Sequence, residues 1–238
     1  MHKTTITKVD HDRWAKAQAF ELSFAQNSVD RGDDGNKWWR KQFNNYKALK
    51  GRTFPEVLEV GCGPHTNVRF ILPLIKFSHL ELEDPLINTY IELQIQKKIA
   101  HLKLLSHPVE IVRLKQKFKS TCLSEPLEEL SLPDDSIDLC VCINVLDHVR
   151  DASMCLKNIE RVTKKGGMVI IGQDLSNEED QVRCPESWSD AGHPIKLDES
   201  FMDEHLGYLN PVLQKILPRE EGRNPRCHYG TYILIGQK

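Results

Sequence analysis

The feature that most constrains the fold is a short apolar run that ends in a glycine-rich turn. Val57, Leu58 and Val60 make up the run, which is typical of a buried parallel strand. Gly61 and Gly63 follow and permit a turn whose backbone conformation most side chains disfavour. A ligand can approach the bare backbone of such a turn closely. The same pattern also occurs where a chain only reverses direction, so the turn alone leaves both explanations open.

The polar residues around this turn narrow the choice of ligand. Glu59 lies at the strand end, where a carboxylate is unusual for core packing but well placed to accept hydrogen bonds from a ligand. Thr66 occupies the position where the dinucleotide fingerprint needs a third glycine or alanine, which disfavours NAD. The segment resembles motif I of the class I S-adenosylmethionine (SAM) dependent methyltransferases. This resemblance implies that Glu59, Gly61, Cys62 and Gly63 contact SAM.

Composition excludes several other classes of protein. The chain has 238 residues, enough for one domain with an elaborated end. Its 32 basic and 34 acidic residues nearly cancel, unlike the basic footprint of a dedicated nucleic-acid-binding protein, so DNA is not an expected partner. Seven cysteines without a Cys-x-x-Cys pair predict reduced thiols and no structural zinc. The absence of a long apolar run predicts a soluble, cytoplasmic protein without a membrane span.

The N-terminal part reads as helical. Apolar residues recur at helical spacing over residues 14–49, interrupted by a polar segment at 30–35. These helices either pack on the sheet or cover the cofactor as a lid. We therefore expect residues 1–50 to form a helical lid or substrate segment and residues 51–238 to form the SAM-binding domain. Trp39 is predicted to face the substrate pocket.

A second strand is predicted within residues 77–86, where apolar and polar residues alternate up to an acidic end. In a doubly wound fold, the carboxylate that ends this strand lies opposite the first glycine turn and can accept the ribose hydroxyls of an adenosine. Asp84, followed by Pro85 and Leu86, resembles the corresponding stretch of a subset of class I methyltransferases. Glu83 is the alternative, and a surface turn that caps a helix is the explanation without a ligand.

The segments that follow these two strands deviate from a simple pattern. Apolar spacing predicts helices over 67–77 and 87–105, although Pro73 would kink or shorten the first. Pro126 stands where related enzymes often have an aspartate that reads the adenine. The resemblance therefore leaves Leu127 and Glu128 as the adenine contacts.

The next part of the chain extends the resemblance. Residues 132–149 contain a turn, an apolar strand and a predicted helix start, and in the family the corresponding strand end borders the methyl donor, which implies that Asn144 lies near the sulfonium. A helix over 156–165, a Gly-Gly turn and a strand over 168–172 follow. The resemblance thus covers residues 55–175.

The C-terminal part predicts a hairpin from the apolar runs 207–217 and 227–236. Residues 174–199, between the strand over 168–172 and this hairpin, are polar and are expected to form a loop above the pocket. The resemblance implies an α/β fold with a doubly wound, seven-stranded, mostly parallel sheet, an antiparallel last strand, helices on both faces and extra N-terminal helices.

Three residues are candidates for acid–base chemistry. Methyl transfer to a hydroxyl requires loss of a proton, and histidine is the commonest general base. His148 is expected at the start of the helix after Asn144, with Asp147 beside it, and His193 lies in the polar segment over the pocket, where Trp188 is expected to contact the substrate. Local packing or hydrogen bonding is the alternative role for either histidine.

The spacing of Asn144, Asp147 and His148 is similar to the Glu-x-x-Glu-His divalent-metal motif of ubiquinone-biosynthesis and small-RNA O-methyltransferases. Asn and Asp replace the two glutamates, which removes one anionic ligand. Because hard cations such as Mg²⁺ favour carboxylate oxygen, no metal is expected.

The resemblance implies transfer of a methyl group from SAM to a small-molecule acceptor, expected to be a hydroxyl of a sugar or another metabolite. An N-methyltransferase and a protein or RNA methyltransferase are the enzymatic alternatives, although no Asn-Pro-Pro-Tyr or Asp-Pro-Pro-Tyr stretch for a nucleobase amine is present. A silent subunit that binds SAM or S-adenosylhomocysteine (SAH) and an NAD-linked oxidoreductase are the others. The oligomeric state is open, with a homodimer as one outcome.

Overall fold

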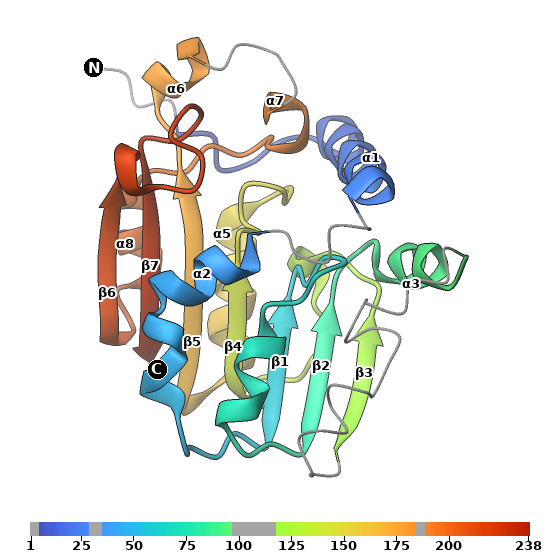
Figure 1. The fold of residues 1–238 in the computed structure, drawn as a ribbon, viewed down its shortest axis with the longest axis vertical. Helices are drawn as coiled ribbons and strands as arrows, with labels where there is room; N and C mark the ends of the chain where they lie inside the picture. Colours follow the sequence, from blue (N-terminus) through green and yellow to red (C-terminus); the bar gives the residue numbers. More distant parts are fainter. Residues whose placement is uncertain (1–4, 29–34, 97–117, 184–188) are drawn as a thin grey trace.

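A seven-stranded sheet organises the chain, with strand order β3-β2-β1-β4-β5-β7-β6. The computed structural model describes residues 5–28, 35–96, 118–183 and 189–238 (Figure 1). The strands are β1 (Glu56–Val60), β2 (His79–Glu83), β3 (Lys119–Leu123), β4 (Ile137–Ile143), β5 (Thr163–Leu175), β6 (Asn210–Pro218) and β7 (Gly230–Gln237). β1 to β5 pair in parallel, and β7 lies antiparallel between β5 and β6. The predicted fold class and C-terminal hairpin are therefore confirmed.

Helices cover both faces of this sheet (Figure 1). The α-helices are α1 (His11–Ser28), α2 (Asn36–Gln42), α3 (Ile87–Gln96), α5 (Ala152–Val162), α6 (Glu178–Arg183), α7 (Ser189–Gly192) and α8 (Glu199–Leu206). The 3-10 helices are η2 (Asn44–Leu49), η3 (Val68–Phe70), η4 (Leu72–Leu74), η5 (Leu127–Glu129) and η6 (Arg219–Glu221). None of the helices within the described ranges has the length and apolar character needed to cross a bilayer.

The core is divided by the sheet into two layers. The layer under α2 and η2 contains Trp39, Phe43 and Leu49, and the layer on the other face contains residues of α5 and α8, such as Leu156 and Phe201. β4 is buried along almost its whole length because β1 and β5 flank it and helices cover both of its faces. α1 and α7 pack side by side beyond the carboxyl ends of the central strands (Figure 1).

Several predicted boundaries are wrong. Residues 67–77 form the two short 3-10 helices η3 and η4 instead of one α-helix, because Pro73 lacks the amide that a continuing α-helix would need. α5 ends at Val162, and β5 then runs to Leu175, well beyond the predicted strand. Of the predicted helix over 87–105, the described part is α3, and the remainder lies outside the described residues.

The polar segment 174–199 is not a simple loop. It contains the end of β5 and the helices α6 and α7, and its residues Ile195 and Leu197 are buried in the core. The segment was predicted to be a loop because most of its residues are polar, and the two buried apolar residues did not stand out.

The prediction that all cysteines are reduced needs a correction. Cys62, Cys122, Cys140, Cys142 and Cys155 are free thiols, but Cys227 is disulfide-bonded.

Candidate functional site

A cavity of about 440 Å³ lies at the carboxyl ends of β1, β2 and β4, beneath α1. Its size falls in the usual range for small-molecule sites. The residues used below that line it are Gln18, Glu21, Trp39, Gly61, Cys62, Gly63, Glu83, Asp84, Pro85, Pro126, Leu127, Glu128, Asn144, Val145, His148, His193, Arg223 and His228. Gly61 and Asp84 thus line the same cavity, as predicted from their positions after the first and second strands. We call the end at the glycine turn the cofactor end and the end at His148 the acceptor end.

Glu59 shapes the cofactor end from below. Its carboxylate accepts hydrogen bonds from the backbone amides of Asn67 at 2.7 Å and Val68 at 3.1 Å, which holds the loop after the glycine turn. Burial raises the pKa of Glu59 to about 7, although these two amides oppose the shift. Glu59 does not line the cavity, so the predicted direct contact with the cofactor is not what the structure shows.

The glycine turn needs glycine for two reasons. Gly61 and Gly63 have φ angles of 55° and 56°, in the left-handed region. A Cβ at Gly61 would also lie 2.5 Å from the Val145 side chain, whereas a Cβ at Gly63 would meet nothing within 4 Å. The turn is therefore closed on its Val145 side and has open space at Gly63, which fits close approach of a ligand.

Two adjacent carboxylates hold this turn. The carboxylate of Glu83 accepts a hydrogen bond from the Gly61 amide at 3.1 Å. The carboxylate of Asp84 accepts hydrogen bonds from the Gly63 amide at 3.0 Å and the Leu86 amide at 2.8 Å. Leu86 thus contributes its amide and does not line the cavity, whereas Pro85 does.

The two carboxylates differ in how fully they are satisfied. The second oxygen of Glu83 is buried and accepts no hydrogen bond. Burial raises the pKa of Glu83 well above its usual value, with the Asp84 charge adding to the shift, and burial also raises the pKa of Asp84 to about 6. An unsatisfied buried oxygen suits a ligand hydroxyl, so the structure supports Glu83 as strongly as Asp84 for the ribose.

The predicted adenine contacts lie on η5, at the same end of the cavity. Leu127 and Glu128 both line it. One carboxylate oxygen of Glu128 accepts hydrogen bonds from the backbone amides of Arg150 at 2.6 Å and Asp151 at 2.8 Å. The Asn158 side chain donates a hydrogen bond to the Leu127 carbonyl at 2.9 Å. η5 is thereby fixed to the start of α5.

Asn144 follows β4 with a φ of 59° and lines the cavity. Arg223 donates to the Asn144 side-chain oxygen at 2.7 Å and pairs with Asp174 at 3.3 Å. The Arg223 guanidinium also lies 5.7 Å from the centroid of the Trp39 ring. Trp39 is 1% exposed and has a double role, because it lines the cavity and packs in the core against Phe43. Trp188 lies outside the described residues.

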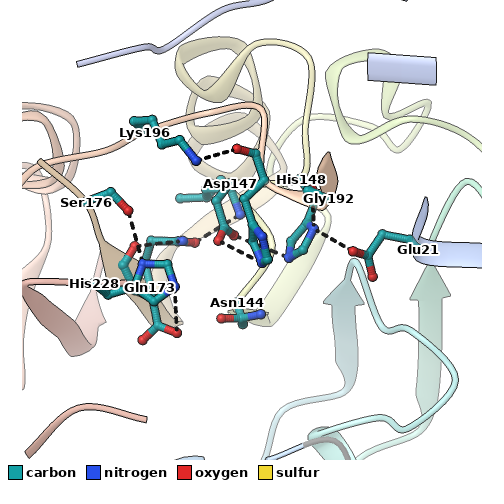
Figure 2. A network of polar contacts seen from close by, with 12 residues as sticks. Glu21, Asn144, Asp147, His148, Gln173, Ser176, Gly192, Lys196 and His228 are labelled. Carbon is teal, nitrogen blue, oxygen red and sulfur yellow. Dashed lines mark hydrogen bonds and ion pairs between the residues drawn. The ribbon is translucent and has the colours of Figure 1, made fainter. Parts of the chain in front are cut away.

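Three side chains converge at the acceptor end, and we call Asp147, His148 and His193 the histidine cluster. His148 Nε2 lies 3.5 Å from Asp147 Oδ1, and His193 Nε2 lies 3.8 Å from Asp147 Oδ2. The other ring nitrogen of His148 lies 2.9 Å from the Gly192 carbonyl and 3.3 Å from Glu21 of α1 (Figure 2). His148 is in a turn before α5, so its predicted place at a helix start is wrong; Asp151 caps that helix.

The charges around His148 change its expected role. Burial alone would lower its pKa, but the carboxylates of Asp147 and Glu21 and the Gly192 carbonyl raise it to about 10. Burial alone would likewise raise the pKa of Asp147, yet His148 and His193 hold it well below its usual range. In the protein without ligand, His148 is therefore protonated at neutral pH. This argues against the predicted role as a general base, which needs an unprotonated ring.

Sequence reasoning missed the residues that the C-terminal hairpin contributes. Arg223 and His228 come from a segment whose composition indicated only a polar turn. His228 Nδ1 lies 3.0 Å from the Ser176 hydroxyl, and burial lowers its pKa, so this ring is neutral (Figure 2). Glu21 was also missed, because a charged residue on an N-terminal helix is usually solvent-facing.

Comparisons with known proteins agree with this geometry. Residues 58–171 match the family described as the methyltransferase domain. The chain is 32% identical over 139 residues to thiol S-methyltransferase TMT1B of Rattus norvegicus. That match covers 58% of this chain and 50% of the relative, so the chain spans about half the length of this relative.

Solved structures establish the fold. The chain is similar to the N-methyltransferase NodS from Bradyrhizobium japonicum WM9 in complex with SAH, with a TM-score of 0.61, 16% identity and coverage of 94% of this chain and 98% of that one. It is also similar to the [4+2]-cyclase SpnF, with a TM-score of 0.62, 14% identity and coverage of 98% of both chains. Since one of these two proteins is named as a cyclase, the fold by itself does not fix the reaction.

Proposed function

We propose that this protein is a class I, Rossmann-like methyltransferase that uses SAM, that it methylates a small molecule, and that the reacting atom is a hydroxyl oxygen. The observation that carries the proposal is one continuous cavity with a cofactor end and a polar acceptor end. A hydroxyl can donate to the carboxylates and accept from the cationic groups at the acceptor end.

The residues present at the cofactor end fit SAM. The unsatisfied oxygen of Glu83 suits a ribose hydroxyl, and the open space at Gly63 admits the ligand next to bare backbone. SAM supplies an activated methyl group on its sulfonium. The protein would hold the acceptor atom in line with it at Asn144 and keep water out, which is how positioning accelerates such a displacement.

We propose that the N-terminal segment 1–50 acts as a lid or substrate segment, and its described residues on α1 and α2 support this role. Gln18 and Glu21 of α1 line the cavity, and Gln18 donates to the His148 carbonyl at 3.2 Å. Trp39 adds an aromatic wall next to Arg223. Acceptor selection would therefore depend on this N-terminal segment. A homodimer and a cytoplasmic location remain predictions.

A thiol is the second candidate acceptor, and the similarity to a thiol S-methyltransferase favours it. Hydroxyls and thiols both lose a proton when they are methylated, so the same polar end serves either one. The test is to measure SAH formation by purified protein with matched pairs of alcohols and thiols that share a carbon skeleton. Turnover with alcohols supports the hydroxyl, and turnover with thiols alone replaces it. SAM binding without turnover of any member of the panel contradicts the proposed function and favours a silent binding subunit.

A further inference from the structure

We propose that Asp147, His148 and His193 bind one divalent transition-metal ion, of which Zn²⁺ is the best-fitting example. Among the described residues, these three each offer a ligand atom, and the atoms all lie within 4.8 Å of one another. Tetrahedral ligands at about 2.1 Å from a zinc ion are about 3.4 Å apart. In the structure, His148 Nε2 lies 3.5 Å from Asp147 Oδ1 and His193 Nε2 lies 3.8 Å from Asp147 Oδ2, so each imidazole is close to this distance from one oxygen of the carboxylate.

Asp147 provides an independent indication of a missing ligand. The residue is 4% exposed, and neither of its carboxylate oxygens accepts a hydrogen bond. Its contacts with His148 and His193 are ion pairs at 3.5 Å and 3.8 Å, longer than hydrogen bonds, whereas buried polar groups are nearly always hydrogen-bonded. A cation placed between the Asp147 oxygens and the two imidazole nitrogens would satisfy it.

The surroundings of His148 prepare it as a ligand. A carbonyl oxygen can only accept a hydrogen bond, so the Gly192 carbonyl at 2.9 Å requires the proton on His148 Nδ1. Glu21 lies 3.3 Å from the same nitrogen. Histidine ligands of metals usually donate their other ring N–H to a carbonyl or a carboxylate in this way. When the ion displaces the second proton, Nε2 is left to bind it on the side of Asp147.

Gly192 makes this arrangement sterically feasible. A Cβ at this position would lie 2.6 Å from the Glu21 carboxylate and 2.7 Å from the Phe20 ring. Only glycine therefore lets the carbonyl and Glu21 approach His148 together. The need for glycine at position 192 thus supports the view that the contacts of His148 are specifically arranged.

The donor set selects the kind of ion. Two imidazoles and one carboxylate suit Zn²⁺ and neighbouring transition metals, whereas Mg²⁺ favours oxygen ligands. Three protein ligands leave a fourth position open, and both histidines line the cavity, so that position faces the acceptor end.

If the proposed function holds, the acceptor would occupy that open position. Its oxygen–hydrogen or sulfur–hydrogen bond would break, with the proton leaving to solvent and the electron pair staying on the acceptor atom. That atom would form the new bond to the methyl carbon while the methyl–sulfur bond of SAM breaks and its electron pair returns to sulfur, which leaves SAH. The ion would promote the proton loss by lowering the pKa of the bound group.

The test measures metal binding directly. The full chain is stripped with EDTA and titrated with Zn²⁺, Mn²⁺ or Mg²⁺ against a chromogenic chelator, and Co²⁺ is used to record the visible absorption of the site. We expect one equivalent of Zn²⁺ to bind and Mg²⁺ to bind at least 100-fold more weakly. His193→Gln is expected to lose Zn²⁺ affinity by more than about 100-fold. Glu21→Gln, which removes only an outer partner of His148, is expected to lose about 10- to 100-fold.

His205→Gln is the matched control, because this histidine lies on α8 and does not line the cavity. It should bind Zn²⁺ like the unsubstituted protein. The proposal is overturned if the unsubstituted protein binds no Zn²⁺, or if His193→Gln and Glu21→Gln both bind it with unchanged affinity. SAH binding by calorimetry checks that each variant is folded. Intact Zn²⁺ binding in a protein that methylates no acceptor would support the metal site while contradicting the proposed function.

Discussion

The backbone amide of Gly63 donates a hydrogen bond to the carboxylate of Asp84 at 3.0 Å, which ties the turn after β1 to the end of β2. The neighbouring Glu83 holds the Gly61 amide at 3.1 Å in the same way. These contacts preorganise the cofactor end, because two glycines with left-handed backbones are fixed before a ligand arrives.

Substitution of Asp84 should weaken cofactor binding. Asp84→Asn removes a negative charge that faces the cavity, and hydrogen bonds to charged groups contribute about 1.5–3 kcal/mol. We expect the Kd for SAH to rise about 10- to 100-fold, measured by calorimetry. Glu92→Gln is the control, because Glu92 is exposed on α3 and outside the cavity. Equal SAH affinity in Asp84→Asn and the unsubstituted protein would show that Glu83 alone serves the ribose.

Gly61→Ala should cost more stability than a glycine substitution elsewhere. Alanine in the left-handed region costs about 1–2 kcal/mol, and the contact of its Cβ with Val145 adds about 1–3 kcal/mol of overpacking. Gly51→Ala isolates the first contribution, because Gly51 has a φ of 77° with nothing within 4 Å of an added Cβ. Denaturant unfolding of both variants measures the difference. If the two variants are equally stable, the approach of Val145 has no energetic consequence.

Glu59 should give the unfolding free energy a defined pH dependence. Its pKa is raised from 4.5 to about 7 in the folded protein, so the folded state binds a proton more tightly than the unfolded state. The stabilisation from this group is complete below pH 4.5 and is lost as the pH rises through 7. Glu59→Gln is neutral throughout and removes this dependence.

Chemical unfolding at pH 4.5 and pH 7.5 measures this effect. The stability of Glu59→Gln relative to the unsubstituted protein should rise by about 3 kcal/mol between the two values. Glu92→Gln, exposed on α3, should show no such change. A constant difference for Glu59→Gln would mean that folding does not shift the pKa of Glu59.

Arg223 should affect acceptor use more than cofactor binding. Its guanidinium contacts Asn144, Asp174 and the face of Trp39 at once, and lysine cannot reproduce this planar arrangement. For Arg223→Lys we expect kcat/KM for the acceptor to fall at least about 10-fold, while the Kd for SAH changes less than about 2-fold. Arg226→Lys, an exposed residue of the same hairpin turn, is the control. A parallel loss of SAH affinity would place Arg223 at the cofactor end instead.

The cofactor end could be predicted from the sequence because its signals are local. The apolar run of β1, the glycines after it and the acidic end of β2 each follow from residue types a few positions apart. Glu59 was predicted to face a ligand, but the amides of Asn67 and Val68 are closer partners that no sequence pattern shows. Apolar spacing predicted a helix over 67–77, and the shortening expected from Pro73 goes further than predicted, because the segment forms two 3-10 helices.

The acceptor end was predicted only in part, because its residues come from distant segments. Asp147 and His148 follow a strand that the sequence identifies, and His193 stands out in a polar segment. Glu21 and Arg223 have no such local signal, since each reaches the site only through the packing of α1 or the hairpin over the sheet. The high pKa of His148 is likewise a property of tertiary contacts, and it argues against the general-base role that the sequence position suggested.

The contact between Glu21 and His148 joins the first helix of the chain to the middle of the sheet. The glycine turn and its two carboxylates, by contrast, lie within 30 residues of one another along the chain, counting 61 to 84. The N-terminal helix and the final hairpin can therefore change in sequence without disturbing the contacts that hold the glycine turn at the cofactor end. A chain that lacks α1 should still bind SAH but lose Gln18 and Glu21 from the wall of the acceptor end.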